Sequence, residues 1–225
     1  MILDKSQTKI LFDEFQKMAH YFGIAVQSVE SNPTTDKKLS LEYQDIEVFF
    51  LAATYNLKTS RLAEGFLCWL LQFGHLLSPS KIRRLIQSGK TFDSAVLGGF
   101  VEFLVENNIM SLQWKIVKPF CKKQKTIKQL IEGPTPRLPT TYFMKYGIVA
   151  PQFKLDLFKF LFLTSAIFKN CLELKNRALF GSVVNADAVS CLTKYSGMTA
   201  YQVAKITYHH KARIFKIYPD ILAAS

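Results

Sequence analysis

The sequence predicts a mainly α-helical protein built from two parts. The first is an N-terminal helical domain that can include a short β element, and the second is a C-terminal helical domain that contains a helix-turn-helix. Apolar residues make up 49% of the 225 residues, which is enough to bury a substantial core. Nineteen Phe against ten Gly favour packed helices over a turn-rich β architecture. Helix start and stop signals also recur along the chain at helical spacing.

The N-terminal elements follow from apolar spacing and capping residues. The spacing predicts helices over residues 6–21, 60–74, 80–87 and 93–107. Thr59 or Ser60, Ser78-Pro79 and Asp93 supply the start signals of the last three, which form a compact unit. Residues 23–30 alternate like a short strand. Residues 44–56 fit a helix or a buried strand over Ile46–Leu51, and periodicity leaves both open.

A proline-rich segment predicts the domain boundary. Residues 133–139 carry three prolines, which remove backbone donors and stiffen the chain. We therefore expect a helical domain for oligomerisation or partner binding over 1–132, a linker over 133–140 and a basic domain over 141–225. Pro151 then opens a predicted helix to Asn170 that is apolar nearly all round. Such a helix lies in the core or contacts a partner, and we expect it in the core.

The charge is distributed unevenly. Residues 1–110 hold 11 Lys/Arg and 12 Asp/Glu, whereas residues 111–225 hold 18 Lys/Arg and 5 Asp/Glu. A basic half beside a neutral half indicates a polyanionic partner such as nucleic acid. The alternatives are an anionic membrane, an acidic protein or a solvated lysine surface.

One lysine-rich stretch stands out within the basic half. Residues 115–128 hold six lysines and no acid, broken by Pro119. They form either a solvated helix face or a set of auxiliary phosphate contacts, namely Lys115, Lys118, Lys122, Lys123, Lys125 and Lys128.

The sequence from residue 173 onward predicts four short helices. Glu173 to Phe180 is stopped by Gly181, a second helix ends at Ser196-Gly197, Thr199 caps a third, and a break near Tyr208–His209 leads into a fourth before Pro219. Ala204 is small enough for a close helix crossing, and Ile214, ten residues on, is placed to anchor the next helix. Val203, Thr207 and Ile217 complete the inward set.

The stretch RALFGS…ADAVSCLTKYSGMTAYQVAKI resembles the opening of many winged-helix and helix-turn-helix transcription regulators. Tyr208 departs from that pattern, because Gly is usual at this turn and a left-handed backbone suits Tyr less well. Too few residues follow Ile217 for a β-hairpin wing after the last helix.

The resemblance implies a set of DNA-binding residues. The fourth helix would face the major groove with His210, Lys211, Arg213 and Lys216 outward. Arg213 would make a bidentate contact to guanine, and Lys194, Lys205, Lys211 and Lys216 would bind phosphates. Tyr201 and Gln202 would touch the DNA backbone. His209 and His210 are a possible partly buried pair, and we expect no metal site there.

The sequence lacks the motifs of common enzymes. It has no Walker A loop, GxGxxG, HExxH or GxSxG, so we expect no catalytic residue, metal or cofactor. We interpret Asp45, Glu47, Glu64 and Asp93 as scattered surface carboxylates. The four cysteines form no CxxC pair, and Cys68 and Cys171 lie in apolar surroundings that predict burial. We find no signal peptide and no apolar stretch near the ~20 residues of a membrane helix, which predicts a cytoplasmic protein.

These observations favour a sequence-specific DNA-binding protein, a transcriptional regulator whose N-terminal half dimerises or binds a partner. Double-stranded DNA is the expected partner. Two alternatives stay open: an antitoxin or immunity-type protein-interaction module, and an RNA-binding protein that uses residues 115–128.

Overall fold

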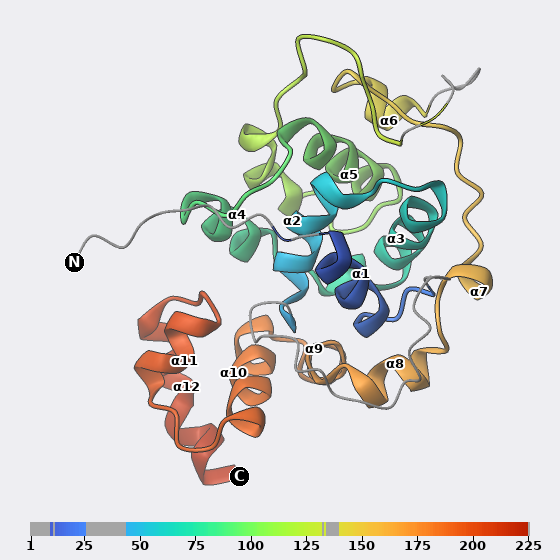
Figure 1. Ribbon diagram of the computed structural model, residues 1–225. Helices are drawn as coiled ribbons and strands as arrows, with labels where there is room; N and C mark the ends of the chain where they lie inside the picture. Colours follow the sequence, from blue (N-terminus) through green and yellow to red (C-terminus); the bar gives the residue numbers. More distant parts are fainter. Residues whose placement is uncertain (1–9, 11, 26–43, 132, 134–139, 225) are drawn as a thin grey trace.

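A computed structural model describes residues 10, 12–25, 44–131, 133 and 140–224 (Figure 1). Helices dominate, and the named strands of this part form one two-stranded sheet, so the mainly α prediction is confirmed. The first helices are α1 (Phe12–Tyr21), α2 (Ile46–Asn56), α3 (Ser60–Phe73), α4 (Pro79–Gln87) and α5 (Ser94–Glu106). The later ones are α6 (Thr141–Met144), α7 (Leu157–Phe160), α8 (Thr164–Asn170), α9 (Leu172–Phe180), α10 (Val183–Lys194), α11 (Ala200–Ile206) and α12 (Lys211–Ala224).

Side-chain caps start the N-terminal helices where the sequence signals stand. Thr59 accepts from the backbone of Leu62, Ser78 caps α4 ahead of Pro79, and Asp93 caps α5. Residues 46–56, which fit a helix or a strand, form a helix because Asp45 caps it. The predicted strand over 23–30 is described only to residue 25.

The first apolar core lies among α1 to α5 and is rich in aromatic rings. Phe49 stacks on Phe22 at 4.7 Å between ring centroids and meets Trp69 edge-on at 5.4 Å. Phe66 lies 5.0 Å from Phe100. These geometries are the favourable ones for aromatic pairs, and they account for the Phe-rich composition of this half.

Residues beyond the predicted linker belong to this same core. Gly99 lets the ring of Phe143 in α6 lie against α5, because a Cβ there would come within 2.0 Å of that ring. Strand β2 (Ile148–Val149) pairs in parallel with β1 (Lys128–Gln129). Cys171 and Leu174 also join the first core.

A second, smaller apolar core joins α10, α11 and α12. Figure 1 shows these three helices grouped at one end of the molecule, with α10 nearest α9. The apolar cores therefore divide between α9 and α10. They do not divide at the predicted linker over 133–140, of which residues 134–139 lie outside the described part.

The continuous helix predicted over 151–170 is wrong. The segment is split into α7 and α8, because the backbone between them forms hydrogen bonds with residues 23–25 and not with its own preceding turn. Ala25 donates its N–H to the carbonyl of Phe160, Phe162 donates to the carbonyl of Gly23, and Ile24 pairs with Leu161. The expected core placement is also wrong for most of this segment, since Phe158 is 94% exposed and Leu163 72% exposed.

The structure also bears on the predicted burial of two cysteines and on membrane-spanning helices. Cys68 and Cys171 are free and buried, as predicted. Within the described residues, no helix has both the length and the apolar character that crossing a lipid bilayer requires.

Candidate nucleic-acid interface

The helices α10 to α12 form a three-helix unit around a few small and branched residues. Ala188, Ala204, Val203 and Ile214 are buried at its centre. Ser182 caps α10, and Thr199 caps α11 in a capping box, in which the Gln202 side chain accepts from the Thr199 backbone N–H at 2.8 Å. The small side chain of Ala204 is buried in the core that α11 shares with α10 and α12.

The turn between α11 and α12 has a left-handed residue at its centre. Tyr208 has a φ of +55°, the conformation for which Gly is usual. A non-glycine residue there costs about 1–2 kcal/mol. The Tyr208 ring offsets part of this cost, because it packs against the first core and the Lys90 ammonium lies 5.8 Å from its centroid.

The cations predicted to face outward on α12 are exposed. They are His210, just before the helix, and Lys211, Arg213 and Lys216 within it; Phe215 is exposed as well, whereas Ile214 is fully buried. Lys205 and Tyr201 of α11 are also exposed, and the Lys211 ammonium lies 4.3 Å from the centroid of the Tyr201 ring. The start of α11 and the start of α12 therefore share one surface.

Two predicted contact residues are engaged elsewhere. Lys194 is half-buried and bonds to Gln44, with the Tyr21 ring 6.0 Å away, so it faces the N-terminal helices and not the exposed face of α12. Burial lowers the pKa of Lys194. Gln202 is exposed, but its side-chain oxygen serves the cap of α11.

The six lysines of residues 115–128 are all exposed. Gln113–Ile116 and Lys118–Phe120 form short 3-10 helices, and Figure 1 places the loop after them at the end of the molecule away from α12. Two of the lysines are paired with acids, Lys118 with Glu102 at 3.4 Å and Lys128 with Asp93 at 2.9 Å.

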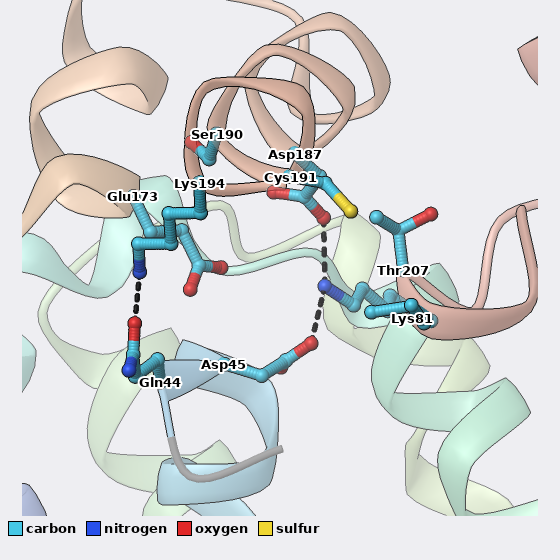
Figure 2. A pocket seen from close by; sticks show the side chains of 10 residues that line it. Gln44, Asp45, Lys81, Glu173, Asp187, Ser190, Cys191, Lys194 and Thr207 are labelled. Atoms are coloured by element: carbon cyan, nitrogen blue, oxygen red, sulfur yellow. Dashed lines mark hydrogen bonds and ion pairs between the residues drawn. The ribbon is translucent and has the colours of Figure 1, made fainter. Parts of the chain in front are cut away.

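A buried charge cluster lies where α10 and the turn before α12 meet the N-terminal helices. It consists of Asp45, Glu47, Lys81, Glu173, Arg177, Asp187 and His209. Figure 2 shows the Lys81 ammonium between the carboxylates of Asp45 and Asp187, at 2.7 Å from each. The interpretation of Asp45 and Glu47 as surface carboxylates is therefore wrong, because both are buried and paired.

Arg177 and His209 complete the cluster. Arg177 donates to Glu47 at 2.7 Å, to Glu173 at 2.8 Å and to Asp187 at 2.9 Å, and also to the Leu76 carbonyl. His209 Nε2 lies 2.8 Å from Asp187, and its Nδ1 lies 3.2 Å from the Arg84 guanidinium. The residues come from α2, α4, α9, α10 and the turn, so the cluster joins both apolar cores.

The pKa values within the cluster diverge because acids outnumber bases. Burial raises the pKa of Asp45 to about 6 against the pull of Lys81, and burial raises the pKa of Glu173 well above its usual value. Burial also acts on Glu47 and Asp187, but Arg177 and Lys81 hold both pKa values below their usual range. Burial lowers the pKa of His209, although its bond to Asp187 acts in the opposite direction. The lowered pKa favours the neutral imidazole near pH 7.

The cluster is built as an ion network. The carboxylates of Asp45, Glu47 and Glu173 lie within 4.8 Å of one another, a spacing that suits a metal ion. Lys81 and Arg177 already donate to those oxygens. A cavity of about 50 Å³ beside them, lined by Gln44, Ser190 and Lys194 among others, has room for about one or two water molecules.

Comparisons with protein-family models, with curated proteins and with solved structures found no match to this chain.

Proposed function

We propose that this protein binds duplex DNA sequence-specifically and acts as a transcriptional regulator, with α12 in the major groove and the start of α11 against the phosphate backbone. The observation that carries the proposal is the two-sided character of α12. Its cations point to solvent, while Ile214 anchors it to α10 and α11. An exposed helix with a basic outer face is the element that helix-turn-helix proteins insert into the groove.

The side chains have different roles in this proposal. Arg213 reads a guanine edge, because its planar fork matches the O6 and N7 acceptors. Lys205, Lys211 and Lys216 bind phosphates, which fix position without reading sequence. Tyr201 lies beside Lys211 and touches the same backbone. The proposal gives Lys194 no contact with DNA, since it faces Gln44.

Fluorescence polarisation with a labelled duplex over a salt series tests the proposal. Each phosphate contact contributes about −0.9 to the slope of log affinity against log salt, so about six contacts give a slope of about −5. A duplex selected from a random pool by the protein should bind more tightly than a scrambled one. Absence of duplex binding at low salt would eliminate the proposed function.

Two variants separate base reading from phosphate binding. Arg213→Ala should reduce the preference for the selected duplex, at a cost of about 1–3 kcal/mol on that sequence. Lys211→Ala should weaken all duplexes alike and lower the salt slope by about one. Lys169→Ala is the matched control, because Lys169 is exposed on α8 in the other part of the fold. Equal effects of all three variants would contradict the assigned roles.

RNA binding through residues 115–128 is tested in the same assay. The exposed lysines of that stretch would then dominate, and a structured RNA would displace the duplex. Replacing Lys122, Lys123 and Lys125 together by Ala separates the two functions, because the loop that follows Phe120 runs at the end of the molecule away from α12 (Figure 1). The proposed function predicts unchanged duplex affinity for this triple variant.

A protein-interaction function is the second candidate, and the exposed apolar side chains of residues 155–163 favour it. Phe158, Phe162 and Leu163 border a groove of about 510 Å³ floored by Phe73 and Ile167. We propose a second copy of this chain as the occupant. This self-association does not depend on DNA binding, although a two-fold dimer would also let a DNA-binding protein read two half-sites. Sedimentation velocity should show a dimer that Phe158→Asp converts to monomer. A monomer at all concentrations would exclude this occupant.

A further inference from the structure

The helix α4 lies beside the start of α12, although the two belong to different parts of the sequence. Arg84 of α4 reaches the turn, with its Nη2 3.2 Å from His209 Nδ1. Lys90, just after α4, lies over the Tyr208 ring. The surface around the turn is therefore built by both parts of the fold.

Arg84 of α4 lies at the boundary between the buried cluster and this surface. It is half-buried, and its Nε is buried and has no hydrogen-bond partner among the residues that the structure describes. A ligand at the surface can therefore reach only the terminal nitrogens of this guanidinium.

A second guanidinium increases the positive charge at this point. Burial lowers the pKa of Arg84, and the next strongest influence is the nearby charge of Arg213, which also lowers it. The carboxylates of Glu47 and Asp187 act in the opposite direction from deeper in the fold, where Lys81 and Arg177 already bind them. An anion at the surface between the two arginines would relieve their repulsion.

The buried cluster fixes this arrangement. Lys81 of α4 bonds to Asp187 of α10, and Asp187 bonds to His209 at the turn. The helix α4 and the start of α12 are thus held by the same buried carboxylate. A ligand that contacts α12 meets α4 at a defined position.

We propose that Arg84 binds a backbone phosphate of the duplex, next to the base edge that Arg213 contacts, so that the N-terminal part of the fold forms one wall of the nucleic-acid interface. The inference rests on the proposed DNA-binding function and extends it to a residue outside the helix-turn-helix. Phosphate suits the site because an anionic oxygen accepts a charge-assisted hydrogen bond from a terminal guanidinium nitrogen.

Arg84→Gln is the decisive variant, because Gln removes the charge and keeps a donor for His209. Duplex polarisation over a salt series should show a slope smaller by about one and an affinity about three- to tenfold lower on selected and scrambled sequences alike. Arg84→Lys should keep the slope. Arg83→Ala is the matched control, since Arg83 is exposed and lies one residue, about 100°, further round the same helix.

Several outcomes would overturn the inference. They are an unchanged slope for Arg84→Gln, an equal loss for Arg83→Ala, or a loss seen with an RNA hairpin and not with the duplex. If the wild-type protein binds duplex DNA with a steep slope while Arg84→Gln is unaffected, the inference alone fails. If the wild-type protein binds no duplex, the proposed function fails with it.

A second measurement uses the native protein and does not depend on the folding of a variant. Phenylglyoxal modifies accessible arginines, and mass spectrometry locates the modified residues. The inference predicts that a saturating duplex protects Arg84 and that an equal concentration of inorganic phosphate does not, because the duplex also contacts α12. Arg83 should react equally in both states. Full reaction of Arg84 in the duplex complex would contradict the inference.

Discussion

The buried lysine of the charge cluster gives the sharpest test of how the two apolar cores are joined. Lys81 is 1% exposed, and its ammonium lies 2.7 Å from Asp45, 3.2 Å from Glu47 and 2.7 Å from Asp187. Lys81→Met keeps the length and removes the charge, leaving the carboxylates with Arg177 as their main cation. Breaking a buried ion network at one partner costs about 3–5 kcal/mol.

That loss is large against a typical total stability of about 5–15 kcal/mol. For a chain of this size it lowers the melting temperature by roughly 6–20 °C. Lys118→Met is the matched control, because Lys118 is exposed and its one ion pair within the described part of the chain is with Glu102, an interaction worth about 0–1 kcal/mol.

Unfolding in urea, followed by two spectroscopic probes, distinguishes which part of the fold Lys81→Met destabilises. The chain has two tryptophans, Trp69 and Trp114, and both are buried in the first core. In urea, tryptophan fluorescence therefore follows the first core, while far-UV circular dichroism follows all helices, α10 to α12 included. Because Lys81 bonds to Asp187 across the two parts, we expect the dichroism transition of Lys81→Met to precede the fluorescence transition.

Two results would refute this reasoning. One is a loss below about 1 kcal/mol with coincident transitions, which would mean that the ion network does not hold α10 in place. The other is a double variant, Lys81→Met with Asp187→Asn, that is less stable than Lys81→Met alone. We expect the double variant to be more stable, because it removes a buried carboxylate that the single variant leaves underpaired.

Three further predictions follow from the described contacts. Asp45→Asn keeps the cap of α2 and removes a carboxyl whose pKa is raised to about 6, so wild-type stability from this group falls as pH rises through about 6. In thermal unfolding, the stability of the variant minus that of the wild type should be larger at pH 8 than at pH 5. A smaller difference at pH 8 would contradict the raised pKa of Asp45. Tyr208→Val should destabilise more than Tyr208→Gly, because a φ of +55° is worst for a β-branched residue, and denaturant midpoints give the order. Gly99→Ala should cost about 1–3 kcal/mol through collision with Phe143, and a neutral effect would show that α6 does not pack there.

Local signals were sufficient to predict much of the helical framework. Asp93, Ser78-Pro79 and Thr199 each cap a helix where the sequence places a hydroxyl or carboxylate before an apolar run. The inward placement of Ile214 and the outward placement of Arg213 also follow from helical spacing. These features depend only on residues within one or two turns of each other.

What sequence reasoning missed depends on long-range packing. The break at residues 161–163 exists because the chain bonds to Gly23 and Ala25, more than a hundred residues earlier. The side of α10 that carries Lys194 meets Tyr21, and nothing in the sequence shows this contact. The one local signal for the buried cluster was Glu47 in the otherwise apolar run of α2.

Arg84 was missed for a related reason. Sequence reasoning gives the cations of α4 no role, although Lys81 lies one turn before Leu85 on the apolar side that Ile82, Leu85 and Ile86 define. The structure separates its three cations: Lys81 is buried against Asp187, Arg83 is exposed, and half-buried Arg84 reaches His209 at the turn before α12. Their different surroundings arise from the docking of α10 to α12, which no local pattern encodes.

The composition of the buried cluster indicates what it contributes. A well-packed apolar contact between α4 and α10 would stabilise their junction at least as well, because desolvating charges offsets most of their attraction. An apolar contact also tolerates sliding and rotation, whereas Lys81 and Arg177 satisfy their carboxylates in one arrangement of the helices. The cluster therefore specifies how α10 and the turn at His209 sit on α4. In the proposed interface this orientation matters more than the added stability, because a phosphate at Arg84 and a base edge at Arg213 can be contacted together only if the two helices keep a fixed relation.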